Sequence, residues 1–320
     1  MKSARRSSVF RSAFHGGLAL TVLAVASCGL LADRVDADPA AVAMARQADS
    51  RATIGGLPEG LAADFTLLES LTPGELGLAV MPVGGSRATV MGELTTGLAW
   101  STIKVPIAVA ALRNDPDGLL DGYAEAAITY SDNAAAGTLW SSLGSDAAQA
   151  VQQVLDEADD VMPGGPWPHT TVENDAFGAT EWSLVDQVRF ASQLPCLPQT
   201  ATVTELMSHI TDEQRWGLGT LDGAIFKGGW GPDDDTGIYL VRQFGLVPAR
   251  DGYVAVAMAA QADDGDFVSA TRMLDNLAAV LGAHLQETRS GNCPATEPVI
   301  AARPNIGKLS AQPGDTRPDS

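Results

Sequence analysis

The chain has 320 residues, of which 45% are hydrophobic and 18% are charged, a composition typical of a globular protein with a sizeable core. Its formal net charge is -19 and its isoelectric point is near 4.4. A phosphate backbone repels so acidic a surface, so these values argue against a nucleic-acid partner.

The N-terminus has the layout of an export signal. A basic stretch, MKSARRSSVFR, precedes an apolar stretch, FHGGLALTVLAV, that is too short to span a membrane. The apolar stretch runs into Val25-Ala26-Ser27-Cys28, which resembles the lipobox of bacterial lipoproteins. The resemblance implies that residues 1–27 are removed and that Cys28 carries a lipid anchor on the outer face of the bacterial cell membrane. The alternative is an unmodified cysteine in an ordinary signal or anchor helix.

A tether and one domain follow the signal. Residues 28–57 are rich in alanine and aspartate and predict the tether, and the domain is expected over 58–288. Hydrophobic periodicity predicts its elements in chain order. They are a helix over 60–71, strands over 75–84 and 87–94 with a tight turn at Gly85 and Ser86, helices over 145–158 and 183–194, strands over 223–230, 237–247 and 253–261, and a helix over 266–285. A flexible tail is expected over 289–320.

This order of elements predicts an α+β fold. Strands from both ends of the domain, over 58–98 and 212–288, can close one antiparallel sheet packed by the terminal helices. Residues 99–211 then form an inserted helical lobe. Within the domain, Cys196 and Cys293 are a candidate disulfide in an exported protein. Two buried free thiols are the alternative, because the sequence gives no distance between them.

The first motif with chemical potential is S-x-x-K at Ser101 and Lys104, within the apolar stretch LAWSTIKVPIAVA. Residues at i and i+3 share one face of a helix. A lysine with a lowered pKa can accept the proton of a neighbouring serine hydroxyl, which activates the serine as a nucleophile. The alternative is a helix-capping serine and a lysine whose ammonium reaches solvent.

Two further motifs follow along the chain. Ser131, Asp132 and Asn133 form an S-D-N tripeptide, which could also be a simple turn or helix cap. Lys227-Gly228-Gly229-Trp230 lies on the third predicted strand, where the alternative is an edge-strand lysine before a turn.

In this order, in an exported chain, the three motifs resemble S-x-x-K, S-D-N and K-T-G, the signatures of the serine β-lactamase and penicillin-binding protein superfamily. The resemblance covers about residues 58–285. It implies a class A β-lactamase-like fold with a five-stranded antiparallel sheet and a shortened helical lobe. It also implies roles: Ser101 is the acylated nucleophile, Lys104 is its proton acceptor, and Ser131 passes a proton to the leaving group. Lys227 supplies positive charge for the substrate carboxylate.

The same resemblance implies a substrate-binding set. Asn133 binds a side-chain amide of the substrate, Gly228 and Gly229 belong to the binding strand, and the backbone N–H groups of Ser101 and Trp230 form an oxyanion hole. The implied substrates are β-lactams or peptidoglycan-like peptides. No metal and no organic cofactor is implied.

Three departures from the family pattern bear on activity. Gly228 stands where the family has threonine, which removes a hydroxyl that helps to hold the substrate carboxylate. The stretch between Ser101 and Ser131 is short, so one wall of the cleft is reduced. No E-x-x-L-N motif supplies a deacylating glutamate, and in the loop over 161–178, with His169 and Asp175, the candidate is Glu173, followed by Asn174. A solvated loop carboxylate is the alternative reading of Glu173.

The sequence therefore predicts a membrane-anchored active-site serine hydrolase that is slow to deacylate. The first alternative is a catalytically inactive lipoprotein of the same fold that binds a cell-envelope partner. Further alternatives within the enzyme class are a D-alanyl-D-alanine carboxypeptidase and an esterase.

Overall fold

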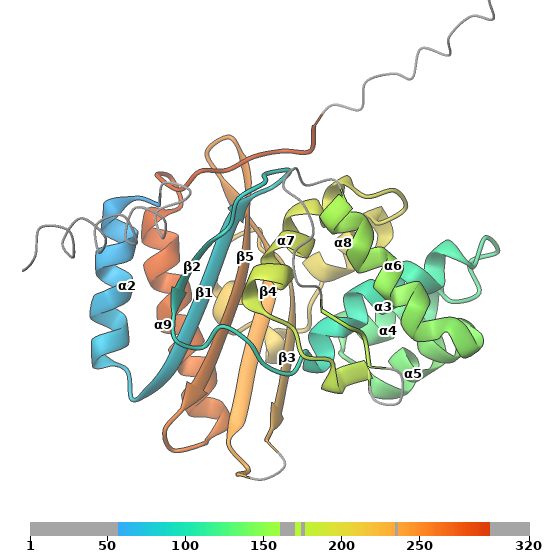
Figure 1. Cartoon of the computed structure of the whole chain (residues 1–320), viewed down its shortest axis with the longest axis horizontal. Helices are drawn as coiled ribbons and strands as arrows, with labels where there is room; N and C mark the ends of the chain where they lie inside the picture. Colours follow the sequence, from blue (N-terminus) through green and yellow to red (C-terminus); the bar gives the residue numbers. More distant parts are fainter. Residues whose placement is uncertain (1–56, 161–169, 174–176, 234–235, 295–320) are drawn as a thin grey trace, which may run out of the picture. The chain divides into compact units, whose positions relative to one another are not determined.

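A five-stranded antiparallel sheet is the centre of the domain in the computed structural model, which describes residues 57–160, 170–173, 177–233 and 236–294 (Figure 1). The strand order is β2-β1-β5-β4-β3. The strands are β1 (Gly74–Pro82), β2 (Thr89–Gly92), β3 (Ile225–Pro232), β4 (Tyr239–Ala249) and β5 (Gly252–Ala262). Strand β1 pairs with β5 along its whole length, from Gly74 opposite Ala262 to Pro82 opposite Val254. The prediction that both ends of the domain close one sheet is confirmed.

The sheet is covered on both faces. Helices α2 (Glu59–Leu71) and α9 (Phe267–His284) lie on one face, and α7 (Leu184–Gln193) packs against β1, β4 and β5 on the other (Figure 1). Asp266 caps α9 by accepting from the backbone N–H groups of Val268 and Ser269. Three layers result, and the aliphatic residues of β4 and β5 are buried between them.

The position of helix α7 differs from the sequence prediction, which assigns residues 183–194 to the helical lobe. Ser183 caps this helix as its spacing to Asp186 predicts, with its Oγ accepting from the Asp186 backbone N–H at 3.1 Å. The helix buries Leu184, Val188 and Ala191. Because this apolar stripe faces the sheet, α7 belongs to the sheet layers and not to the helical lobe.

The helical lobe is built around α3 (Lys104–Arg113). Helices α4 (Asp121–Thr129), α5 (Asn133–Ser142), α6 (Ala147–Asp160) and α8 (Ala201–Ser208) all contact it. Residues 104–111 of α3 are consequently all buried. A helix enclosed on every side needs no polar face, which accounts for the uniformly apolar stretch that follows Lys104.

Two predicted boundaries are wrong. The connection between β1 and β2 is not a tight two-residue turn, since it runs over 83–88: the Val83 N–H bonds to Tyr253 O, and the Gly84 N–H bonds to Ser192 O. The predicted tail from 289 also begins too early, because Gly291 exchanges two backbone hydrogen bonds with Tyr253. The domain therefore extends to at least residue 294.

Some predictions fall outside the described residues. These are the export signal with Cys28, the tether up to residue 56 and the tail from 295. Of the helices that the structure describes, none is both long enough and apolar enough to cross a membrane.

Candidate active site

Ser101 lies on the 3-10 turn Trp100–Ile103, which leads directly into α3 at the junction of sheet and helical lobe. The backbone of Trp100 has φ +48°, in the left-handed region that bulky residues rarely adopt. Such a conformation persists only where its surroundings impose it. Here the Ala99 N–H donates to Thr180 O at 2.7 Å, which fixes the approach to the turn.

A cavity of about 390 Å³ opens beside this turn. Its volume is in the range of small-molecule sites. The residues that line it come from the turn, α3, the start of α5, the segment 177–179 and strands β3 and β4. They are Trp100, Ser101, Lys104, Asn133, Phe177, Gly178, Trp230, Gly231, Pro232 and Tyr239.

Lys104 is buried in the wall of this cavity, with 1% of its surface exposed. Its Nζ donates to the backbone oxygen of Ser131 at 2.5 Å, to Asn133 Oδ1 at 2.6 Å and to Ser131 Oγ at 3.3 Å. Burial lowers the pKa of Lys104 to about 8, and the nearby negative charge of Asp132 opposes that shift. The amine is therefore more readily deprotonated than that of an ordinary lysine, and its neutral form can accept a proton.

Lys227 joins the same group from β3. It is fully buried, and its Nζ donates to Ser131 Oγ at 3.0 Å and to Gly228 O at 2.9 Å. Burial, and secondly the positive charge of Lys104, lowers the pKa of Lys227 well below its ordinary value. Ser131 Oγ thus lies between two amines, a position from which it can relay a proton.

The S-D-N loop holds Ser131 in place. Ser131 has φ +59°, and Asp132 caps α5 by accepting from the Ala135 N–H at 2.7 Å. Asp132 therefore stabilises the loop, while Ser131 contacts both lysines and Asn133 contacts Lys104.

The geometry of β3 supports an oxyanion hole. A Cβ on Gly229 would lie 2.8 Å from the backbone nitrogen of Ser101, so only glycine allows this approach of strand to turn. Strand β3 is an edge strand, and the Asp233 N–H donates to Ile238 O across the β3–β4 pair. Since backbone groups alternate along a strand, the Trp230 N–H points away from β4, toward the Ser101 turn.

Arg242 supports the turn that carries Ser101, a role that no sequence pattern predicts. This buried guanidinium donates to Gly97 O at 2.7 Å, Leu98 O at 3.1 Å, Trp182 O at 2.8 Å and Gln187 Oε1 at 3.0 Å. Gln187 in turn donates to Thr102 Oγ1 at 3.0 Å, in the Ser101 turn. A strand arginine without a nearby carboxylate has no sequence signature.

The candidate deacylating base, Glu173, lies at the end of the described segment 170–173. Its side chain is exposed and its backbone N–H donates to Thr180 Oγ1 at 3.0 Å. Among the described residues of this loop, Phe177 and Gly178 line the cavity, and neither can act as a base. His169, Asn174 and Asp175 lie outside the described residues.

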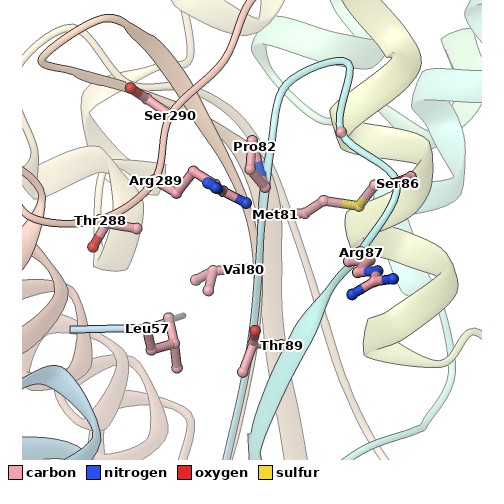
Figure 2. Close-up of a pocket in the computed structure, with 11 residues that line it drawn as sticks. Leu57, Val80, Met81, Pro82, Ser86, Arg87, Thr89, Thr288, Arg289 and Ser290 are labelled. Carbon is pink, nitrogen blue, oxygen red and sulfur yellow. The ribbon is translucent and has the colours of Figure 1, made fainter. Parts of the chain in front are cut away.

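A larger cavity, about 540 Å³, lies at the far end of β1, and Figure 2 shows the guanidinium groups of Arg87 and Arg289 near it. None of the motif residues lines it. The smaller cavity is therefore the candidate active site. Within the described part of the chain no cluster of histidine, cysteine, aspartate or glutamate could hold a metal ion.

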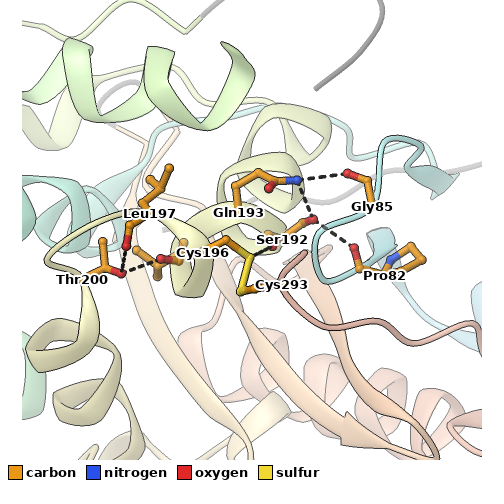
Figure 3. Close-up of a disulfide and its surroundings, with 9 residues drawn as sticks. Pro82, Gly85, Ser192, Gln193, Cys196, Leu197, Thr200 and Cys293 are labelled. Atoms are coloured by element: carbon orange, nitrogen blue, oxygen red, sulfur yellow. Dashed lines mark hydrogen bonds between the residues drawn. A yellow bond between two sulfur atoms is a disulfide. The ribbon is translucent and has the colours of Figure 1, made fainter. Parts of the chain in front are cut away.

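Cys196 and Cys293 are joined in a disulfide with a Cα–Cα distance of 5.2 Å (Figure 3). The bridge lies beside the hydrogen bonds from Ser192 Oγ to Pro82 O at 2.9 Å and from Gln193 Nε2 to Gly85 O at 3.0 Å (Figure 3). It fastens the C-terminal segment to the 3-10 turn Leu194–Cys196 that follows α7, and neither cysteine lines the active-site cavity.

Solved structures of other proteins have the same fold, although the chain matches no known sequence family. No family model and no curated protein matches the chain. Solved structures do: the extended-spectrum β-lactamase TLA-1 matches with a TM-score of 0.57 and 14% identity, over 71% of this chain and 98% of its own. The chain has the serine β-lactamase fold.

Two further structures with this fold agree. A β-lactamase from Chitinophaga pinensis matches with a TM-score of 0.57 and 12% identity, over 70% of this chain and 99% of its own. PBP-A matches with a TM-score of 0.55 and 19% identity, over 72% and 97%. At these identities the likeness shows the fold alone, and function has to be argued from the site.

Proposed function

We propose that the protein is a membrane-anchored active-site serine hydrolase of the β-lactamase and penicillin-binding type. It acts through an acyl-enzyme on Ser101 and deacylates slowly. The substrate classes are those implied by the fold, β-lactams or peptidoglycan-like peptides. The observation that carries the proposal is the hydrogen-bonded group of Lys104, Ser131 and Lys227 beside the cavity that Ser101 lines.

The acylation step uses each of these residues once. Ser101 Oγ attacks the carbonyl carbon and its proton passes to the neutral Nζ of Lys104. The N–H groups of Ser101 and Trp230 stabilise the developing oxyanion. When the bond to the leaving group breaks, Ser131 Oγ gives that group a proton and regains one from Lys104. Lys227 holds Ser131 Oγ in position for this transfer.

The described residues that line the cavity support slow deacylation. Hydrolysis of the acyl-enzyme needs a base that activates water. The described loop residues on the cavity wall are Phe177 and Gly178, while the carboxylate of Glu173 is exposed to solvent. A variant of PBP-A was solved as an acyl-enzyme complex with penicillin G, which shows that a protein of this fold can hold such an adduct.

Intact-protein mass spectrometry of the mature domain with a penicillin tests this reaction. We expect an adduct that persists over the time course in wild type and is absent from Ser101→Ala. The matched control is Ser141→Ala, which removes an exposed hydroxyl from α5 and should leave the adduct unchanged. An equal adduct on Ser101→Ala would contradict the assignment of the nucleophile.

Membrane anchoring rests on the Val25–Cys28 stretch alone. We expect the full chain, expressed in a bacterium, to incorporate radioactive palmitate and to partition into detergent. Cys28→Ser should lose both properties. Incorporation that is unchanged by Cys28→Ser would rule out this anchor.

One observation favours a second candidate, an inactive lipoprotein that binds a cell-envelope partner. In the described structure Lys104 Nζ bonds to Ser131 and Asn133, and no hydrogen bond joins it to Ser101. Catalytic hydrogen bonds often tighten only when substrate binds, so this arrangement does not remove the first candidate. The inactive candidate predicts no adduct with esters, β-lactams or peptides, and no phenotype for Ser101→Ala.

A further inference from the structure

The cavity lacks the features that would hold a substrate carboxylate. Among the described residues that line it, the amine of Lys104 is the one cationic group, and that amine is committed to three acceptors. Lys227 is fully buried, and its Nζ is bonded to Ser131 and Gly228. No arginine lines this part of the described structure.

The indole ring of Trp216 occupies the space beside Gly228, where the family has a threonine side chain. A Cβ on Gly228 would lie 3.2 Å from both Cη2 and Cζ2 of Trp216, so a larger side chain would meet the indole ring. Gln243, opposite Gly228 in the sheet, donates to Trp216 O at 2.8 Å and accepts from the Leu218 N–H at 2.7 Å. Its amide is therefore occupied in holding the Trp216 segment.

Two arginines lie near Gly228 and Trp216: Arg215 is adjacent in sequence, and Arg242 is near in strand register. Arg215 precedes Trp216, stacks over the Phe226 ring at 5.9 Å and donates to Gly219 O at 3.5 Å. Arg242 pairs with Gly229 across β3 and β4, so its side chain lies on the Gly229 face of the sheet and not on the Gly228 face. Its Nη1 and Nη2 donate to the segments that support the Ser101 turn. Arg215 is half-buried and keeps further donors, but neither arginine is among the described residues that line the cavity.

Aromatic side chains line the part of the cavity where a cationic group would bind a carboxylate. Trp216, Trp230, Tyr239 and Phe267 form a continuous cluster, with ring centroids 5.6–6.3 Å apart. Trp230 and Tyr239 line the cavity together with Trp100 and Phe177. Rings of this kind bind flat apolar groups, whereas an unpaired carboxylate in such a site loses its hydration without compensation. The net charge of -19 further disfavours anions.

We infer that the cavity selects acyl donors that are uncharged beside the scissile bond and carry an aromatic or other apolar group, with esters as the favoured class. This inference rests on the Ser101 mechanism of the proposed function, and it replaces carboxylate-bearing substrates by neutral esters as the preferred class. Ser101 Oγ displaces the alcohol from the ester carbonyl, the alcohol leaves with a proton from Ser131, and water then releases the carboxylic acid and restores Ser101.

A matched pair of substrates tests the inference on the wild-type protein. The first is the phenylacetate ester of 3-hydroxybenzoic acid, whose leaving group carries a carboxylate, and the second is its neutral methyl ester. Acylation rates of Ser101 are measured by intact mass and divided by the rates of hydroxide-catalysed hydrolysis. We expect the neutral member to react about tenfold faster or more, the effect of one hydrogen bond to a charged group.

The three outcomes separate the two proposals. Equal or faster acylation by the charged member overturns the selectivity and leaves the Ser101 mechanism intact. A faster neutral member supports the selectivity, provided that Ser101→Ala shows no adduct. If neither ester, nor benzylpenicillin or its methyl ester, modifies Ser101, then the proposed function fails and the selectivity fails with it.

Two double variants test whether the missing hydroxyl at position 228 causes the preference for the neutral ester. The double variant Trp216→Ala/Gly228→Thr supplies a hydroxyl and the space for it, and Trp216→Ala/Gly228→Val is isosteric without the hydroxyl. We expect only the threonine variant to shift the rate ratio toward the charged ester, by about tenfold. An equal shift in the valine variant would show that the hydroxyl is not the determinant. Melting temperatures verify that both variants fold, and the wild-type comparison stands if they do not.

Discussion

The two faces of β3 differ sharply within a few residues. On one face, Lys227 lies against Ser131 and Lys104 in a polar, hydrogen-bonded group. On the other, Gly228 and Trp230 lie among aromatic rings, and no arginine is among the described residues that line the cavity. The first face keeps the residues that would break a bond, while the second has lost those that would recognise a carboxylate. Reaction chemistry and substrate recognition are therefore separable on this strand.

The largest effect is expected on the Lys227 face. Lys104→Met removes the proton acceptor, and we expect acylation to fall by about 10²–10⁴-fold for both esters of the matched pair. Stopped-flow or intact-mass kinetics measure this loss. A change in the ratio between the two esters, rather than in both rates together, would show that Lys104 contributes to recognition and break the separation of the two faces.

The disulfide belongs to neither face, so its loss should reduce stability without altering selectivity. It closes a loop with a sequence separation of 97, for which chain entropy gives a stabilisation of about 4.7 kcal/mol. Cys196→Ser/Cys293→Ser should lower the free energy of unfolding in urea by about that amount. The ester ratio of the folded variant should equal that of wild type, and an altered ratio would argue that the bridge shapes the cavity.

Arg242 tests how much the Ser101 turn depends on support from the sheet. Arg242→Met removes the donor of four hydrogen bonds, two of them buried, and we expect a loss of about 3 kcal/mol in the free energy of unfolding. Arg242→Lys keeps the positive charge but has fewer donors, so its free energy of unfolding should lie between those of wild type and Arg242→Met. Urea titrations that place Arg242→Met within about 0.5 kcal/mol of wild type, the size of an ordinary surface effect, would refute this role.

The smallest effect is expected at Asp132. Its charge raises the pKa of Lys104, so Asp132→Asn should lower that pKa further and move the rise in acylation rate to lower pH. Asparagine still caps a helix, which keeps α5 intact. Asp132→Ala should show the same shift with an added loss of about 1 kcal/mol in stability. A shift to higher pH would mean that the charge acts in the opposite sense.

The sequence predicts the sheet, the terminal helices and the three motifs, because alternation, helical periodicity and motif order are local signals. It does not predict that α7 packs on the sheet, since an amphipathic stripe does not say which partner it meets. It also cannot show that Trp216 fills the space beside Gly228, or that Arg242 holds the Ser101 turn. Both depend on which side chains the fold brings together across distant segments.

The pH dependence of Ser101 acylation tests the central claim most directly. Only the neutral form of Lys104 accepts a proton, and burial lowers its pKa to about 8. The acylation rate of wild type should therefore rise with pH through about 8 and then level off. A rate that still rises at about pH 10, as an unperturbed lysine would give, would contradict the account. A rate that is constant between about pH 6 and 10, or the absence of any Ser101 adduct across that range, would contradict it too.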